Sequence, residues 1–489
     1  MTPRRVSEAI ALALTTSLFV GVVAAEDVKV ERFHAFVVGS PARGFREDRA
    51  DAVRSGWTQT PLPRGTLRTL WATPVAAIDA SPPMRSGGAR EGPRSAPLVD
   101  GGARGGPRSA PLVDNSWTDI RPTIDQASVV DENGTVYAVD TSMKVTSLAS
   151  NGTVRWTLRP STGGKGPSPL ALLTDGTLVV LDSSGQVFAV KQGSVRWSVA
   201  LGFESRTAST LALDDGGVGV SAGRVMAILD VDGNVRARTK VPDTIETPLV
   251  ASRGIILAAD ATGAVWSWKP GPGTPERIGG FGEPTDSFAA VDRWLVAVPR
   301  SGTRVLALDV SNGQTSVFAT ATPGERYTGP PTLDPIAPER ETSAFILAAT
   351  ASSLSFVVVG LEGRARETRL LQGYSPIAST DGGIEPISAE ARTPPLVDPS
   401  GTLVFATSGG DVGIVRGESV WRAIAVCGHY RLDSDPAASH AGRALPLVIG
   451  LAPLRPGAVV ATCGSGVIVA LEEEHEAGLT GGKGEEANL

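Results

Sequence analysis

Histidines, acidic turns and glycine loops are the features of this chain whose residue types could support chemistry. Of the four histidines, only His429 and His440 lie near each other, in a segment that also holds Asp433 and Asp435. Such a set could form a metal or catalytic cluster, but a loop that wraps over the fold accounts for it more simply. The chain also has no Gly-x-Ser-x-Gly nucleophile motif. We therefore predict no catalytic residues, no metal ligands and no cofactor.

Two short motifs partly resemble ligand-binding loops. Residues 230–234 read Asp-Val-Asp-Gly-Asn, like the start of a calcium loop, but the later ligands and the terminal Glu are missing. Residues 163–166 resemble a phosphate-binding loop, but no Ser or Thr follows the lysine. Because Asp, Asn and Gly favour turns for backbone reasons, we interpret the first as a turn between strands and the second as a connection.

Glycosylation and aromatic stacking are two further possibilities that the sequence raises. Asn133 and Asn151 each begin an Asn-Gly-Thr sequence, which fits the N-glycosylation pattern. Asn-Gly is also the favoured two-residue hairpin turn, and we prefer that interpretation. Six tryptophans could form stacking surfaces for sugars or a quinone, although their recurrence at strand ends favours packing between sheets. These are Trp156, Trp197, Trp266, Trp268, Trp294 and Trp421.

The composition is that of a globular, turn-rich chain. Of its 489 residues, 41% are hydrophobic and 20% charged, with 57 Gly and 36 Pro, so wholesale disorder is excluded. The net charge of −6 argues against a general nucleic-acid binder.

Residues 1–25 have the pattern of a secretory signal peptide. Arg4 and Arg5 precede a short apolar run, and the segment ends in Val-Ala-Ala. The alternative is a membrane anchor, for which the run is short. We expect a mature chain that begins at Glu26, is periplasmic or secreted from a bacterium, and has no membrane span.

A repeat of about forty residues organises the rest of the chain. The sequence Gly-x-Val-Arg-Trp occurs at 152–156 and 193–197, and weaker copies begin at Gly233, Gly273, Gly313, Gly363 and Gly417. The glycines are spaced by 41, 40, 40, 40, 50 and 54 residues. A second series, in which a turn glycine precedes an apolar run, keeps step with the first at Gly185, Gly223, Gly263 and Gly302.

Each repeat reads as four short strands joined by turns, without a helical pattern. One such sheet cannot cover both of its faces, so successive sheets must pack around an axis as the blades of a β-propeller. Residues 115–472 allow roughly eight blades of 40–45 residues. We predict an all-β fold with a single propeller, most simply of eight four-stranded blades, and with seven blades as the alternative.

The two ends of the repeat region predict how the ring closes. The last copy of the second series ends at Leu471 and is not followed by a Gly-x-Val-Arg-Trp strand. The missing strand appears near the N-terminus, where residues 65–71 read Gly-Thr-Leu-Arg-Thr-Leu-Trp. We predict that this strand completes the last blade, since closure removes an open sheet edge.

These observations divide the chain into six segments. We predict a signal peptide (1–25), an N-terminal extension (26–64), the closing strand (65–75), a Pro/Gly/Arg-rich linker (76–116), the blades (117–471) and a disordered acidic tail (472–489). Within the linker, residues 89–102 and 103–116 are a tandem duplication that matches at 11 of 14 positions.

Cys427 and Cys463 are the only cysteines. Cys427 falls at the end of the seventh predicted blade and Cys463 in the eighth, so they could form a disulfide in an oxidising compartment. The bond depends on whether their Cα atoms lie within roughly 7 Å of each other.

The repeats resemble the PQQ-like β-propeller repeat family, over about residues 44–471. The family motif is close to Ala-x-Asp-x-x-x-Gly-x-x-x-Trp, and its Trp docks between neighbouring blades. Residues 307–317 keep the spacing but lack the Trp, whereas Trp156 and Trp197 keep the Trp and shorten the earlier part. Residues 44–56 also resemble the opening segment of many exported propellers.

The resemblance implies two kinds of function. The family includes quinoprotein dehydrogenases, which place a quinone over a disulfide of adjacent cysteines and bind calcium, and this chain has no adjacent pair. It also includes non-catalytic scaffolds such as the propeller lipoprotein of outer-membrane barrel assembly, although no cysteine follows the apolar run here.

We therefore expect a monomeric, non-catalytic binding or scaffolding module of the cell envelope, without a cofactor. Its partners would be envelope or secreted proteins bound through the propeller loops or one face, and not nucleic acid. The alternatives are a quinone-dependent periplasmic oxidoreductase and a carbohydrate- or cell-wall-binding propeller.

Overall fold

The computed structural model describes residues 44–45, 58–75, 124, 126–160, 168–202, 207–252, 254–271, 273–291, 293–334, 343–349, 354–360, 366–370, 393–407, 410–416, 419–423, 426–427 and 448–474. These residues form β-strands and turns, and among them no helix is long and apolar enough to cross a membrane. The predicted signal peptide, the linker beyond 75 and the tail beyond 474 lie outside this set, as do His429, His440 and residues 163–166.

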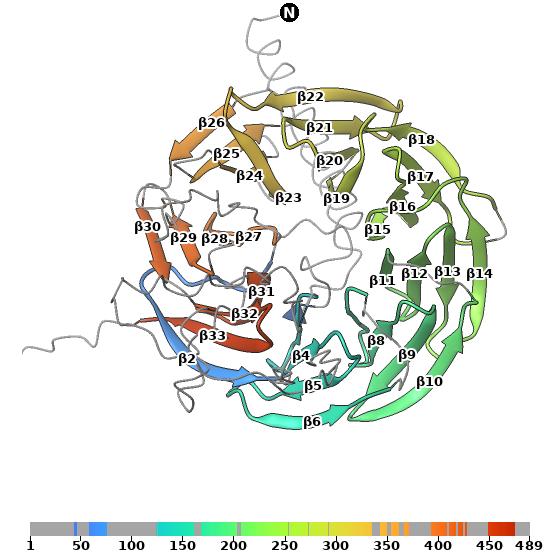
Figure 1. Ribbon diagram of the computed structural model, residues 1–489, viewed down its shortest axis with the longest axis horizontal. Coiled ribbons are helices and arrows are strands. Elements are labelled where there is room, and N and C mark those ends of the chain that lie inside the picture. The colour runs from blue at the N-terminus through green and yellow to red at the C-terminus, as the bar shows by residue number, and fades with distance from the viewer. Residues whose placement is uncertain are drawn as a thin grey trace, which may run out of the picture.

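Eight antiparallel sheets are arranged in a ring, which confirms the prediction of an eight-bladed propeller (Figure 1). The innermost strands, from blade 1 to blade 8, are β3 (Val129–Asp131), β7 (Ala171–Leu172), β11 (Ala208–Ala212), β15 (Val250–Ser252), β19 (Thr285–Val291), β23 (Arg326–Asp334), β27 (Leu396–Val397) and β31 (Val448–Arg455). The second strands are β4 (Val136–Val139), β8 (Leu178–Leu181), β12 (Val218–Ala222), β16 (Ile255–Ala259), β20 (Trp294–Pro299), β24 (Ser343–Ala349), β28 (Leu403–Ala406) and β32 (Ala458–Cys463).

The outer half of each blade contains the two repeat series found in the sequence. The third strands are β5 (Val145–Leu148), β9 (Gln186–Lys191), β13 (Val225–Leu229), β17 (Ala264–Trp268), β21 (Arg304–Asp309), β25 (Leu354–Gly360), β29 (Val412–Arg416) and β33 (Val467–Glu473). The outermost strands are β6 (Val154–Leu158), β10 (Ser194–Ala200), β14 (Val235–Lys240), β18 (Glu276–Gly280), β22 (Gln314–Thr320), β26 (Arg366–Leu370), β30 (Ser419–Ala423) and, in blade 8, β2 (Leu67–Pro74). Every copy of the Gly-x-Val-Arg-Trp series therefore begins an outermost strand.

The N-terminal strand closes the ring, as predicted. β2 pairs antiparallel with β33, from Leu67 opposite Glu473 to Pro74 opposite Val467. β33 continues two residues past the predicted end of the blades at 471. The reason is that β2 pairs with it throughout, and Glu472 is held by Arg68 and Arg455 at 2.7 and 2.5 Å. These two arginines lower the pKa of Glu472 below its usual value.

Residues 58–66 form a strap across the turns of blades 7 and 8. The backbone N–H of Thr58 donates to Val397 O, and that of Leu62 donates to a carboxylate oxygen of Asp398, both at 2.9 Å. Gly457 N–H then donates to Pro61 O at 3.0 Å. Leu62 is almost fully buried in the core beneath. The strap therefore ties blade 7 to blade 8 before the chain turns outward into β2.

A two-residue strand, β1 (Gly44–Phe45), adds a fifth strand to the sheet of blade 1. Gly44 lies opposite Asp131 and Phe45 opposite Val130 of β3. Because β3 is the innermost strand, β1 covers an edge that would otherwise face the axis of the ring.

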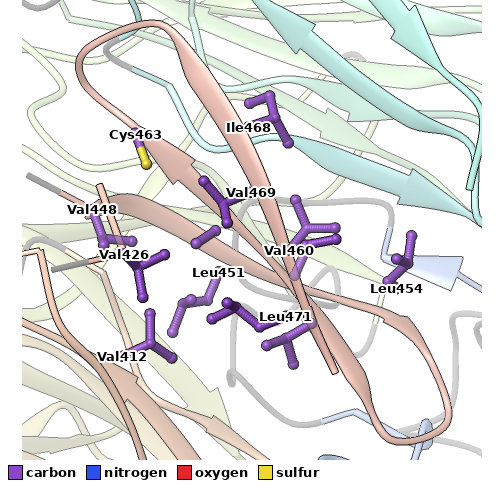
Figure 2. Close-up of a cluster of buried hydrophobic side chains, with 14 of the residues drawn as sticks. Val412, Val426, Val448, Leu451, Leu454, Val460, Cys463, Ile468, Val469 and Leu471 are labelled. Atoms are coloured by element: carbon purple, nitrogen blue, oxygen red, sulfur yellow. The ribbon is translucent and has the colours of Figure 1, made fainter. Parts of the chain in front are cut away.

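Apolar layers between the blades form the core. Separate clusters fill the joints from blades 1–2 through 5–6, and the largest cluster runs continuously through blades 7, 8 and 1. Figure 2 shows part of this largest cluster, in which Val412 and Val426 face Val448, Leu451 and Leu471 of blade 8. The most extensive apolar core therefore lies where the N-terminal and C-terminal parts of the chain meet.

Candidate interaction surface

The Gly-x-Val-Arg-Trp motif encodes a tight turn followed by a β-bulge. In blade 1, the strand pairing passes from Val154 directly to Trp156, so that Arg155 is an extra residue. The same shift passes over Arg196 in blade 2 and Arg236 in blade 3. A bulge bends the strand and redirects its side chains. The motif therefore places an arginine on the rim of each of these blades.

Each arginine reaches the turn between the first two strands of its own blade. Arg155 Nη1 donates to Thr135 Oγ1 at 3.1 Å, Arg196 Nη1 lies 3.0 Å from Asp175 Oδ2, and Arg236 Nη1 pairs with Asp215 Oδ2. Partial burial acts to raise the pKa of Asp215, but the hydrogen bonds from Arg236 and from Gly217 N–H outweigh it and lower the pKa. The pKa of Asp175 is likewise lowered, because hydrogen bonds from Lys191 and Thr177 outweigh its burial. Both turns thus carry a carboxylate that is charged at neutral pH.

Tryptophans hold three neighbouring joints rigid. Trp71 of blade 8 packs on Gly152 of blade 1, Trp156 of blade 1 on Gly193 of blade 2, and Trp197 of blade 2 on Gly233 of blade 3. A Cβ atom at Gly152 or Gly233 would lie 2.6 Å from the indole ring, so only glycine allows this approach. The indole N–H groups of Trp71 and Trp197 donate to Ser150 O and Val231 O at 2.9 and 2.8 Å. These contacts explain the Trp-docking pattern of the repeat.

Exposed valines accompany the docked tryptophans. The valine of the motif is 51% exposed at Val154, 40% at Val195 and 46% at Val235. Val231, whose carbonyl accepts the Trp197 indole N–H, is 46% exposed. Exposed valines beside docked aromatic rings offer apolar area that a partner protein could bury.

β14 differs from the other outer strands in its charge. Arg236, Arg238 and Lys240 are all exposed, and Arg238 and Lys240, which lie beyond the bulge, share one face of the strand. β14 contains no acidic residue, and neither do β2, β6 and β10. We call Val231, Val235, Arg236, Arg238 and Lys240 the β14 surface.

Residues 230–234, which resemble the start of a calcium loop in the sequence, form a turn between strands. Asp230 Oδ1 accepts hydrogen bonds from Asp232 N–H at 2.9 Å and from Asn234 N–H at 2.8 Å, and Gly233 has a φ of 86°. The hydrogen bonds from the Asn234 side chain and backbone lower the pKa of Asp230. Among the residues that the structure describes, no group of three or more His, Cys, Asp or Glu side chains could hold a metal ion.

Cys427 and Cys463 form a disulfide in the structure. Their Cα atoms are 5.5 Å apart, across 36 residues of sequence, and both residues are buried. Figure 2 shows Cys463 beside the apolar cluster of blades 7 and 8. The bond ties the end of blade 7 to the second strand of blade 8.

The acidic partners of the arginines and the basic face of β14 were not predicted from the sequence. A signal for the first was present, because Asp175 and Asp215 each precede their arginine by 21 residues. For the second, the alternation of Arg236, Arg238 and Lys240 was visible in the sequence, but its exposure depends on the place of β14 at the rim.

Comparisons with known proteins found a matching family model and similar solved structures. A family model described as outer membrane protein assembly factor BamB matches residues 132–383. The crystal structure of BamB from Moraxella catarrhalis is 15% identical over 73% of this chain and 97% of that chain, with a TM-score of 0.47. The computationally designed Ika8 protein is 12% identical over 72% of this chain and 96% of that chain, with a TM-score of 0.50. No curated protein matches the sequence.

Proposed function

The chain belongs to the PQQ-like β-propeller family described as outer membrane protein assembly factor BamB, and from that premise we propose that it is a non-catalytic protein-binding scaffold of the bacterial cell envelope. The single observation that carries this proposal is the outer rim of blades 1–3. There the docked tryptophans fix a rigid frame on which exposed valines and arginines recur once per blade. Repeat proteins commonly use such regularly spaced surfaces to bind other proteins.

Two features support an envelope location for the mature chain. Residues 1–25 have the composition of a signal peptide. Disulfides persist in oxidising compartments, and Cys427 and Cys463 are bonded in the structure. On this proposal, residues 76–116 tether the closing strand to blade 1. N-terminal sequencing of protein from the periplasmic fraction should give Glu26, and a chain that retains Met1 would contradict export with cleavage.

Photo-crosslinking in the native cell would test the scaffold function. A photoreactive amino acid is placed at Val154 or Val195 of the full chain, and at Gln314 in β22 as a matched rim position. We expect irradiation to link envelope proteins through blades 1–3, identified by mass spectrometry. A chain that links to no envelope protein from Val154 or Val195, or that links equally well from Gln314, would contradict the proposal.

Binding and activity assays on the purified full chain distinguish the scaffold function from the two alternatives, a quinone-dependent oxidoreductase and a carbohydrate- or cell-wall-binding propeller. We expect no stoichiometric quinone binding and no dye-coupled alcohol oxidation after incubation with PQQ and calcium. We also expect no binding on a glycan array or to peptidoglycan. Quinone-dependent turnover would replace the scaffold by an oxidoreductase.

A further inference from the structure

The disulfide joins two blades that are otherwise connected by a long stretch of chain. Residues 281–284 link blade 4 to blade 5 and residues 321–325 link blade 5 to blade 6, whereas residues 424–447 run from β30 of blade 7 to β31 of blade 8. The bond bypasses most of this connection, because Cys427 lies just beyond β30 and Cys463 is the last residue of β32. A crosslink restricts the open chain and so favours the folded arrangement. The bond therefore does for the last joint what short connections do for earlier ones.

The turn that begins at Cys463 also holds the end of the closing strand. Gly466 N–H donates to Cys463 O at 3.0 Å, and Gly466 O accepts a hydrogen bond at 2.8 Å from the N–H of Val75, the residue after β2. Both cysteines belong to the apolar cluster of blades 7, 8 and 1, and Leu70 and Trp71 of β2 pack against the same cluster. Movement of β32 away from blade 7 would therefore disturb both the turn and the cluster that support β2.

The pairing of β2 with β33 joins segments that lie near opposite ends of the chain. Bringing distant segments together costs loop-closure entropy, and correctly placed blades between them must offset this cost. The ion pair between Arg68 and Glu472 adds little, because the Arg68 side chain is mostly exposed. Closure by β2 therefore depends on how firmly blade 8 is held against blade 7.

We propose that oxidation of Cys427 and Cys463 controls closure of the ring, so that β2 detaches from β33 while the thiols are reduced and pairs with it once the bond forms. In the oxidation, the two thiols give up two protons and two electrons to the disulfide of a thiol–disulfide exchange partner, which becomes a pair of thiols. The use of this control in the cell rests on the proposed envelope location, because disulfides persist in oxidising compartments. The ring would then close only after export.

Hydrogen exchange on the purified full chain would test this inference. The chain is unfolded in urea, reduced, and refolded either with oxidised glutathione or with excess dithiothreitol, and the variant C427S/C463S is refolded in parallel. We expect the amides of β2 and β33 to exchange faster by about tenfold or more in the reduced chain and in the variant than in the oxidised chain. The amides of β12 and β13 in blade 3 should exchange equally in all three samples.

A variant weakened at another joint provides the matched control. F318A removes buried packing between blades 5 and 6, and in its oxidised form it should leave the exchange of β2 unchanged. The reduced chain keeps both cysteine side chains, so fast exchange of β2 in C427S/C463S alone would assign the effect to packing and overturn the proposal. Equal exchange of β2 in all samples would also overturn it. So would a loss of protection in every blade, because the bond would then support the whole fold rather than its closure.

Failure of this inference is distinguishable from failure of the proposed location. Periplasmic protein that begins at Glu26, but whose β2 amides exchange equally in the oxidised and reduced chains, would support export and reject control by the bond. A chain that retains Met1, but whose β2 exchange slows on oxidation, would reject export with cleavage and keep the control of closure.

Discussion

The outer strands of blades 1–3 and those of blades 4–5 both contain a one-residue bulge, but at different places along the strand. In blades 1–3 the extra residue is the third after the motif glycine, near the start of the strand, and in blades 4–5 it is the fifth, nearer the end. The extra residue is an arginine in blades 1–3, Ile278 in blade 4 and Phe318, which is 9% exposed, in blade 5. Phe318 instead packs edge-on against Trp294, with ring centroids 5.3 Å apart.

The joints between blades change in the same way. Between blades 4 and 5, no indole lies on the turn glycine. Gly313 instead touches the backbone of Ile278, and Thr315 Oγ1 donates to Gly280 O at 2.5 Å. Direct backbone contact thus replaces the Trp–Gly docking of blades 1–3. Each of these outer strands therefore keeps a bulge, whereas the position of the bulge and the side chain that it carries differ between the two regions.

The largest effect should come from adding a methyl group at Gly313. Its φ of 71° is unfavourable for alanine, and the new Cβ would overlap the backbone oxygen of Ile278, which cannot move alone. We expect G313A to lower the free energy of unfolding by about 4 kcal/mol, measured by urea denaturation. G233A should cost less, because the Trp197 side chain can shift.

Gly254 provides the control for that experiment. It also has a positive φ, of 73°, but a Cβ there meets nothing within 4 Å. G254A should therefore cost only about 1 kcal/mol. If G313A were no worse than G254A, backbone contact would not hold the joint between blades 4 and 5.

Removing a docked indole should have the next largest effect. W197A loses ring packing on Gly233 and the hydrogen bond to Val231 O, so we expect a loss of about 3 kcal/mol in unfolding free energy. W197F keeps much of the packing and should lose about 1 kcal/mol. I278A lies at the joint without an indole, and its loss of unfolding free energy should lie between the losses for W197A and W197F. Equal losses for W197A and W197F would show that the hydrogen bond, rather than packing, dominates.

A buried carboxylate in blade 4 should give a smaller, pH-dependent effect. Asp260 is 2% exposed and accepts hydrogen bonds from Thr262 and Ala264 N–H groups and from the Trp266 indole at 2.8 Å. Burial acts to raise the pKa of Asp260, but the hydrogen bonds from Thr262, Trp266 and Ala264 outweigh it and lower the pKa.

The sign of the pH dependence follows from this lowered pKa. A carboxyl whose folded pKa is lowered stabilises the fold above its unfolded pKa of about 4, and the contribution is lost as pH falls through the folded value. D260N should cost about 2 kcal/mol at pH 7, and its deficit relative to the unsubstituted chain should shrink in acid. D215N, at the exposed rim of blade 3, should show a smaller deficit that depends on salt. A D260N deficit that is constant from pH 7 to pH 3 would contradict this account.

The smallest effect should come from the exposed valines. Replacing Val154, Val195 and Val235 together by threonine should change the unfolding free energy by less than about 0.5 kcal/mol for each site, because all three are 40–51% exposed. F318A, at the inward-facing bulge of blade 5, should cost about 3 kcal/mol. A large loss in the valine variant would mean that these side chains serve stability rather than binding.

Much of this fold follows from spacing in the sequence. The 40-residue interval located the outer strands, and the missing last copy located β2 beside β33, because a propeller leaves only one place for an unpaired strand. The bulge was not predictable, since a one-residue shift changes no residue type and appears only in the pairing. The basic face of β14 was also missed, because the sequence alone does not say which alternating face is solvent-exposed.

The pairing of β2 with β33 has a consequence for the order in which the protein can form. β2 is among the first segments of the chain to be synthesised and β33 among the last. Thr69 therefore cannot pair with Leu471 until most of the chain has been made. Seven blades can assemble from neighbouring residues, but the eighth requires both ends at once. A chain that ends before residue 467 would lack β33, so β2 with Trp71 would have no strand to pair with. The ring would then stay open, and quality-control proteases would degrade the incompletely folded chain.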